Sequence, residues 1–141
     1  MEIQFTVPGR PKGKGRPRAT MAAGHARIYT PADTVNYENW VRLCYRQEHP
    51  GVMLAGPVSM VVAAYFAVPK SYSKKKAALC ASGALKPTCK PDMDNIVKAV
   101  ADALNGVAYR DDSCIVSLSV HKLYGDAERL EIVLQGEEAP R

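Results

Sequence analysis

Apolar and polar residues alternate with a period of two in three segments of the chain, which is the pattern of a β-strand with one buried face. These segments are residues 3–7, 114–124 and 129–135. A fourth segment, residues 57–68, is almost continuously apolar, and we expect a long strand partly buried on both faces. Because only the short turn at Gly125-Asp126 separates the last two alternating segments, they predict an antiparallel hairpin.

Three helices are expected between these strands. The first begins near Thr30, whose side chain can cap it, with Pro31 at the first helical position. A short basic helix follows Ser73, a second capping residue. The third runs over residues 93–105 and ends at Gly106. The apolar face of the first helix consists of Tyr37, Trp40, Val41 and Cys44.

The order of these elements favours an α+β fold, a mixed or antiparallel sheet packed by helices, over a doubly wound parallel fold. At 141 residues, the chain is expected to form a single compact domain over residues 1–141. Residues 9–30 are rich in proline and glycine and predict an exposed basic arm. Residues 136–141 are expected to form a frayed tail.

The chain carries 19 lysines and arginines against 14 acidic residues, a net charge of +5. This balance indicates a polyanionic partner such as nucleic acid. The four cysteines and three histidines lack the spacing of a zinc site or a disulfide framework, so reduced thiols in a cytoplasmic protein are expected. No apolar segment is long enough to span a bilayer, and no membrane partner is expected.

Basic residues occupy every second position at the start of the arm. The segment GRPKGKGR lacks the Walker pattern and its Ser/Thr metal ligand, so no nucleotide-binding loop and no small-molecule cofactor are expected. The arm either contacts DNA phosphates or remains solvated, and the sequence leaves both possibilities open. The candidate DNA-binding residues are Arg10, Lys12, Lys14, Arg16, Arg18, Lys74, Lys75, Lys76, Lys90 and Arg110.

Five of the seven aspartates lie between residues 90 and 113. Asp92 stands at the start of the third helix, Asp94 lies in its first turn, and Lys98 follows one turn later. If the helix start lies beside the start of the next strand, Asp92 and Asp94 converge with Asp111 or Asp112. Repulsion among these carboxylates is relieved by a bound cation, and oxygen ligands suit Mg²⁺ or Mn²⁺.

Each of these aspartates alone has an ordinary structural explanation as a helix cap, an i, i+4 ion pair or a turn residue. Together they offer more negative charge than the local backbone can use. Carboxylates with a metal ion, surrounded by basic residues, are what phosphodiester hydrolysis requires. The set therefore indicates a metal-dependent nuclease.

The segment KPDMDNIVKAVADALNGVAYRDDSCIV resembles the central motif of the RusA family of Holliday junction resolvases, notably its phage and prophage members. The shared pattern is D-x-D-N, a lysine four residues after the second aspartate, D-A-L, and a later D-D before a strand. PKGKGRPR, YTPADTVNYE, PKSYSKKK and HKLYG are also similar, so the resemblance covers most of the chain.

This resemblance implies a homodimeric α+β endonuclease that resolves four-way DNA junctions with Mg²⁺, or Mn²⁺ as a substitute, in recombination and repair. It places the catalytic residues at Asp92, Asp94, Asp112 and Lys98. The same three aspartates are the implied metal ligands, with Asp111 as a further candidate. One departure is that TCKPD, with only Lys90, replaces the run of arginines found before D-x-D in well-known members.

Two other functions remain open at this stage. A junction-binding protein could have kept the fold and lost cutting, although the complete aspartate set with Lys98 argues against this. A nuclease acting on flaps, replication forks or RNA is equally compatible, because substrate shape is read by surfaces that the sequence alone does not assemble.

Overall fold

The computed structural model describes residues 1–15, 18–22 and 24–140, without the side chains of Arg18 and Ala22. Arg16 therefore lies outside the described residues, as does the end of the tail at Arg141. The elements are β1 (Glu2–Pro8), β2 (Arg18–Ala22), β3 (His25–Tyr29), α1 (Ala32–Glu48), β4 (Leu54–Ala67), α2 (Lys74–Ala81), α3 (Met93–Ala103), a 3-10 helix η1 (Asp112–Cys114), β5 (Ile115–Gly125) and β6 (Arg129–Glu138).

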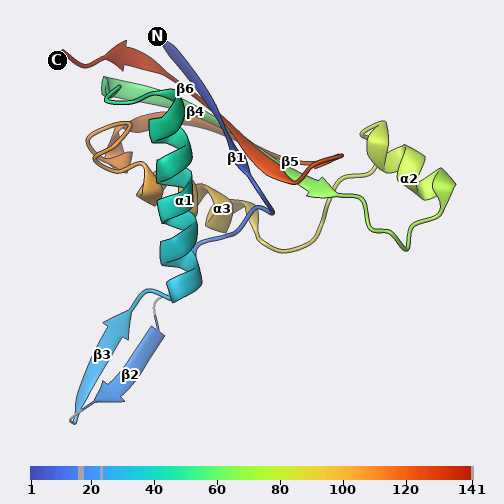
Figure 1. Ribbon diagram of the computed structural model, residues 1–141, viewed down its shortest axis with the longest axis horizontal. Helices are drawn as coiled ribbons and strands as arrows, with labels where there is room; N and C mark the ends of the chain where they lie inside the picture. The colour runs from blue at the N-terminus through green and yellow to red at the C-terminus, as the bar shows by residue number, and fades with distance from the viewer. Residues whose placement is uncertain (16–17, 23, 141) are drawn as a thin grey trace.

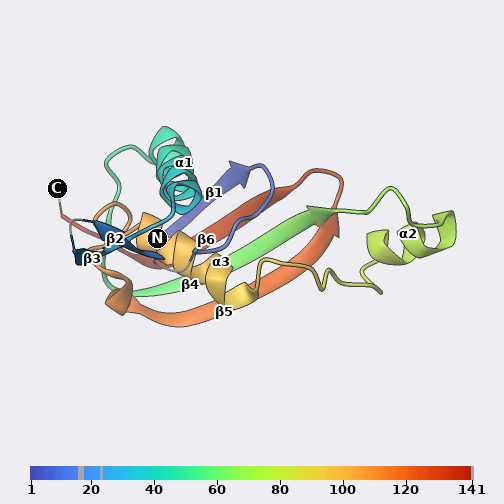
Figure 2. The ribbon, with the colours of Figure 1, turned by 90° about the horizontal axis from the view of Figure 1, so that it is seen from below.

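A four-stranded mixed sheet with the order β1-β6-β4-β5 forms the centre of the molecule (Figure 1). β4 pairs in parallel with β5 and antiparallel with β6, which pairs antiparallel with β1. Helices α1 and α3 cover the same face of this sheet, whereas α2 lies beyond the strand ends (Figure 2). The predicted α+β class with a mixed sheet is confirmed. No helix in the described ranges is long and apolar enough to cross a membrane.

The alternation seen in the sequence places one face of each central strand in the core. Ile3, Phe5 and Val7 of β1 are buried, as are Leu130, Ile132 and Leu134 of β6. In β4, Val58, Met60, Val62, Ala64 and Phe66 are buried, whereas Val61 on the other face is exposed. Apolar residues of α1 and α3 close the core from above.

The predicted hairpin of residues 114–124 and 129–135 is wrong, because β4 lies between β5 and β6. β4 is the most apolar strand, and the central position buries its backbone polar groups against a partner on each side. β5 carries exposed Ser117, Ser119 and His121, which suit an edge strand. The buried face expected for residues 114–124 is not formed, because Val116 and Leu118 are 68% and 45% exposed. The Gly125-Asp126 turn thus leads across the end of β4.

The predicted frayed tail is also wrong over most of its length. β6 continues to Glu138, the Gly136 amide donates to the Met1 carbonyl at 3.1 Å, and the Ala139 amide donates to the Met53 carbonyl at 2.8 Å. These bonds satisfy backbone groups that a frayed tail would leave to water. Residues 136–138 are therefore part of the sheet.

The predicted arm, residues 9–30, has two parts with different structures. Its outer part is not a loop, because β2 and β3 form an antiparallel ribbon that projects from the body (Figure 1). Its inner part, residues 10–15, is docked on the body through hydrogen bonds from Lys14 to Asn95 and from Gly15 to Thr34. Every ribbon side chain that the structure describes is exposed, whereas Pro11 is buried and Lys14 is half-buried.

The predicted helix boundaries need small corrections. Thr30 does not cap α1: Pro31 occupies the cap position without a side-chain cap, and its carbonyl accepts from the Val35 amide. An extended Pro31 lies between Thr30 and the first turn, so the Thr30 hydroxyl is one residue too early. Ser73 caps α2 as predicted, with its hydroxyl accepting from the Lys76 amide at 3.2 Å.

Two further positions differ from the expected pattern. Trp40, predicted on the apolar face of α1, is 38% exposed and donates from Nε1 to the Pro8 carbonyl at 2.8 Å. The third helix ends at Ala103 instead of Asn105, and Gly106 follows with a φ of +71° that favours glycine.

Candidate active site

The D-x-D pair lies at the start of α3. Asp92 occupies the N-cap position without a side-chain cap bond, and Asp94 lies in the first turn. Free amides and the helix dipole favour negative charge here. Both carboxylates are exposed, and within the described ranges no hydrogen bond or ion pair engages Asp94. Asp94 is therefore available to a ligand.

The loop before α3 is held by Lys122 of β5. Its ammonium donates to the carbonyls of Cys89 and Pro91, the latter at 3.1 Å. Lys122, His121 and Asp92 also line an open hollow of about 500 Å³ between this loop and β5. The edge strand β5 thus fixes the position of the loop that leads to Asp92.

Lys98 links two carboxylates on the outer side of α3. The buried stripe of α3, which includes Ile96 and Val100, turns the opposite side of the helix outward. The Lys98 ammonium lies 3.1 Å from Asp102 and 4.0 Å from Asp112. The structure therefore brings together the predicted pair Lys98 and Asp112, and adds Asp102, which was not among the predicted site residues.

Asp111 and Asp112 have different surroundings although they are adjacent. The Asp111 carboxylate accepts a 3.0 Å hydrogen bond from the Ser113 amide and caps η1. Hydrogen bonds from Ser113 hold the pKa of Asp111 below its ordinary value. Asp111 therefore has a structural role in the turn, whereas Asp112 faces Lys98.

The pKa of Tyr109 is affected by the negative charge of this region. Its hydroxyl is buried and donates to the Ala101 carbonyl at 2.8 Å. Burial raises the pKa of Tyr109, and the charges of Asp112, Asp102 and Asp111 raise it further. These three carboxylates thus act on one buried phenol beneath the site.

The carboxylates present have the oxygen donors that Mg²⁺ prefers. In the described part of the chain, however, no group of three or more His, Cys, Asp or Glu side chains is gathered closely enough to hold a metal ion. Asp112 approaches Lys98, one helical turn beyond Asp94. The oxygen donors of these side chains suit Mg²⁺. However, Asp92, Asp94 and Asp112 do not converge into a metal-binding set as predicted.

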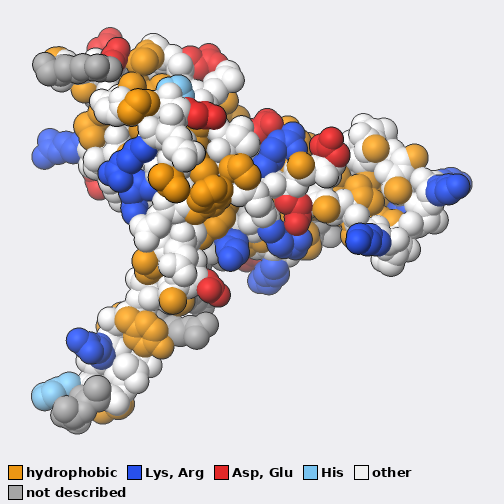
Figure 3. Space-filling view, in the orientation of Figure 1, with side chains coloured by type: hydrophobic (Ala, Val, Ile, Leu, Met, Phe, Trp, Pro, Cys, Tyr) orange, Lys and Arg blue, Asp and Glu red, His pale blue; other side chains and the backbone are white. Residues whose placement is uncertain are grey.

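The predicted DNA-binding residues fall into separate regions. Lys90 is exposed beside Asp92 at 3.5 Å, and Arg10 pairs with Glu128 at 2.9 Å. The lysines of α2 lie on a projection at the opposite end of the molecule from the ribbon (Figure 1). Basic and acidic side chains intermingle on the face between these two projections (Figure 3). Lys12 and Arg110 are also exposed.

Lys14 differs from the other basic residues of the arm. Its side chain is 21% exposed, and its ammonium lies 2.7 Å from Glu38 and 3.2 Å from Asp102. Burial acts to lower the pKa of Lys14, but hydrogen bonds to Glu38 and Asp102 outweigh this effect and raise it. Lys14 thus remains charged inside an ion-pair network.

Sequence reasoning missed three residues of this region: Glu38, Asp102 and Lys122. Asp102 follows Lys98 by four positions in the D-A-L motif, and this i, i+4 spacing could have identified it. Lys122 lies in the HKLYG segment. Glu38 is one of several charged residues on α1, and no sequence signal distinguishes it.

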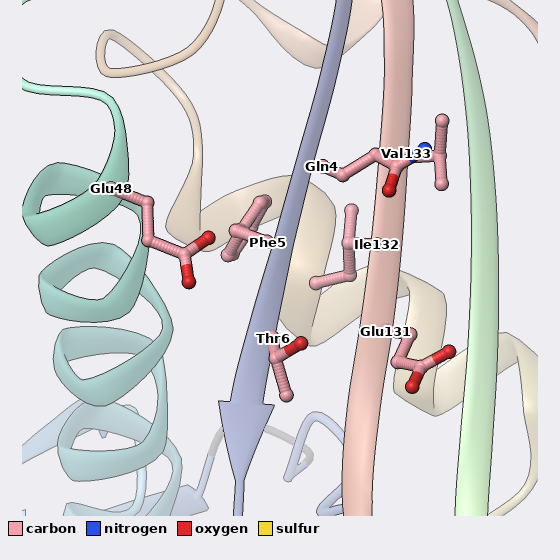
Figure 4. A pocket seen from close by; sticks show the side chains of 7 residues that line it. All are labelled: Gln4, Phe5, Thr6, Glu48, Glu131, Ile132 and Val133. Carbon is pink, nitrogen blue, oxygen red and sulfur yellow. The ribbon is translucent and has the colours of Figure 1, made fainter.

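A second hollow lies beside β1 and β6, away from this site (Figure 4). Its lining includes Glu48 of α1 and Glu131 of β6, but none of the residues around Lys98. It holds no basic side chain that would bind phosphate. The acidic group at α3 remains the best candidate for nuclease chemistry.

Comparison with known proteins identifies a nuclease family. The family model described as Endodeoxyribonuclease RusA matches residues 8–135. The chain belongs to the RusA endodeoxyribonuclease family. Membership of this family implies a nuclease of the Holliday junction resolvase type that binds branched DNA and typically depends on a metal ion.

A relative of this RusA-family chain is the Bacillus subtilis (strain 168) protein described as "Uncharacterized protein YqaN". The two are 43% identical over 135 residues, which cover 94% of this chain and 95% of the relative. The similarity therefore includes the arm, the D-x-D helix and η1 together, and it extends over the same single domain.

Proposed function

We propose that this protein is a Mg²⁺-dependent, structure-selective endonuclease that resolves four-way DNA junctions by paired symmetric nicks in recombination and repair. One observation carries the proposal. In this RusA-family chain, exposed Asp94 in the first turn of α3 precedes Lys98 by one helical turn, and Lys98 contacts Asp112. Exposed Asp92 at the start of the same helix adds a further acidic donor to this region.

Asp92, Asp94 and Asp112 would hold the metal ion once its binding draws their separated carboxylates together, and Mn²⁺ would substitute for Mg²⁺. When bound, such an ion polarises the scissile phosphate and lowers the pKa of the attacking water. Asp111 is the less critical member of the D-D pair, because its carboxylate already caps η1. The arrangement leaves Asp94, which lacks a protein partner among the described residues, as the carboxylate most open to a ligand.

Lys98 supplies positive charge next to these carboxylates. Its side chain is 58% exposed, so the ammonium can reach a phosphate while it stays near Asp112. A cation at this position stabilises the negative charge that develops on the phosphate in the transition state. Exposed Arg10, Lys12, Lys90 and Arg110 would bind the surrounding DNA backbone, as would the lysines of α2.

Resolution of a four-way junction also requires two nicks, placed symmetrically about the crossover. A C₂ homodimer presents two equivalent sites and is the simplest arrangement that achieves this. The apolar strand of residues 57–68 and the α1 face around Tyr37 and Trp40 are the candidate interface surfaces. Exposed Val61 and Trp40 are available for this contact, whereas Tyr37 is buried in the core.

The test uses a synthetic four-way junction and a linear duplex of the same sequence. With Mg²⁺ we expect paired nicks in junction strands of like polarity, no cutting of the duplex, and no cutting of either DNA in EDTA. Binding of the junction without cutting in Mg²⁺ or Mn²⁺ would instead indicate a junction-binding protein. Faster cutting of flaps, forks or RNA would identify another substrate.

A further inference from the structure

The inner arm is built into the acidic site instead of lying free beside it. The Lys14 amide donates to the Asn95 carbonyl of α3 at 2.8 Å, and the Gly15 amide donates to the Thr34 hydroxyl of α1 at 2.9 Å. The segment therefore bridges the first turns of both helices. These bonds fix the backbone on each side of the Lys14 side chain.

Glycine is required for this close approach. A Cβ atom at Gly13 would lie 2.8 Å from the Cβ of Asn95 and 2.9 Å from that of Pro91. A Cβ atom at Gly15 would lie 2.6 Å from the Thr34 hydroxyl oxygen. All three distances are well inside van der Waals contact. The glycines on either side of Lys14 thus allow the arm to lie directly on the residues that flank Asp92 and Asp94.

The Lys14 ammonium extends this bridge into the ion-pair network. It contacts Glu38, which is almost buried, and one carboxylate oxygen of Asp102. The other oxygen of Asp102 contacts Lys98, which in turn reaches Asp112. Asp102 therefore holds two ammonium groups, one on each oxygen, so the position of Lys98 depends on how Lys14 occupies Asp102.

We infer that Lys14 is a positioning residue of the site: by holding Glu38 and Asp102, it locks the arm onto α3 and orients Lys98 toward Asp112. This inference rests on the proposed nuclease function. It assigns Lys14 a role different from phosphate contact, because its ammonium is occupied by two carboxylates and its side chain is mostly covered. Without Lys14, Asp102 would be free to draw Lys98 away from Asp112.

The test compares Lys14→Met with Lys12→Ala, which also removes one positive charge, at an exposed arm residue. Under single-turnover conditions, Lys14→Met should slow junction cutting by about 10- to 100-fold, the usual effect of losing a residue that orients a site. Its affinity for the junction should stay within about twofold of wild type. Lys12→Ala should show the reverse, with weaker binding and normal cutting at saturation.

A double variant tests whether Lys14 affects cutting through Asp102. If Lys14 acts through Asp102, Lys14→Met combined with Asp102→Asn should cut no more slowly than the slower single variant. If the rate losses of the two single variants multiply in the double variant, Lys14 does not act through Asp102. Loss of affinity in Lys14→Met that matches Lys12→Ala, with unchanged cutting at saturation, would make Lys14 a phosphate contact and overturn the inference.

A readout without DNA separates this inference from the proposed function. Amide hydrogen exchange at Lys14 and Gly15 reports whether the arm is docked. Lys14→Met should accelerate exchange at the residue 14 and Gly15 amides by about tenfold or more, whereas Lys12→Ala should leave it unchanged. Unchanged exchange in Lys14→Met would refute anchoring by Lys14. A wild-type protein that cuts no branched DNA would refute the nuclease function, and the exchange result would still decide the anchoring.

Discussion

Gly13→Ala tests whether the arm docks beside the D-x-D pair. The added Cβ would meet the Cβ atoms of Asn95 and Pro91 at 2.8 and 2.9 Å, and neither is the end of a flexible side chain. The backbone must therefore move. Overpacking of this kind costs about 1–3 kcal/mol, and replacing glycine with alanine returns about 0.4–1 kcal/mol through the unfolded state. Midrange values leave a net loss of about 1.3 kcal/mol in the free energy of unfolding.

For a chain of this length, the unfolding entropy is about 0.3 kcal/mol/K, so this loss lowers Tm by about 4 °C. Junction cutting should fall as well, because the displaced contacts flank Asp92 and Asp94. The assay is thermal unfolding by circular dichroism, followed by cleavage at a temperature where both proteins are folded. Lys12→Ala is the control and should change Tm by less than about 2 °C.

The reasoning would be refuted by a Gly13→Ala protein with wild-type Tm and wild-type cutting. Such a result would mean that the arm does not pack against Pro91 and Asn95 in solution. A lower Tm with unchanged cutting would confirm docking, but it would show that the position of the D-x-D pair does not depend on the arm.

Three further predictions concern cutting, DNA binding and assembly. Lys98→Ala should slow cutting at saturating junction by about a hundredfold or more with little change in affinity; equal losses would make Lys98 a simple phosphate contact. Neutralising Arg10 and Lys12 should reduce the slope of log affinity against log salt by about 0.9 for each lost duplex contact, and an unchanged slope would refute those contacts. Mixed dimers with one Asp94→Asn subunit should nick one strand and stall, whereas sedimentation of a monomer on junction DNA would exclude the dimer.

The sequence predicted the four strands of the main sheet and most helix positions from local patterns, but it missed β2 and β3. Residues 3–7 and 129–135 alternate in sequence and are buried on one face in the structure. Strand pairing could not be predicted in this way, because it depends on which strands compete for the central positions of the sheet. Nothing within residues 114–135 reveals that β4 separates β5 from β6, and the short turn favoured the wrong partner.

In the candidate site, too, sequence patterns predicted local features but not tertiary contacts. The motif pattern identified Lys98 and Asp112, and the structure brings these two together. The bridge from Lys14 to Asp102 joins residues 88 positions apart in the sequence. It forms only because the glycines beside Lys14 let the arm approach two helices, and this approach depends on the packed tertiary structure. Sequence patterns therefore located the acidic helix but not the residues that support it.

The central claim is that the carboxylates at the start of α3 carry metal-dependent cutting of junction DNA. The most direct test is the single-turnover cleavage rate of a four-way junction by Asp94→Asn and wild-type protein in Mg²⁺, with the affinity of both for the junction measured in EDTA. We expect Asp94→Asn to bind as tightly as wild type or more tightly, because repulsion of phosphate falls, and to cut at least about a hundredfold more slowly. Cutting by Asp94→Asn at the wild-type rate would contradict the assignment of the site.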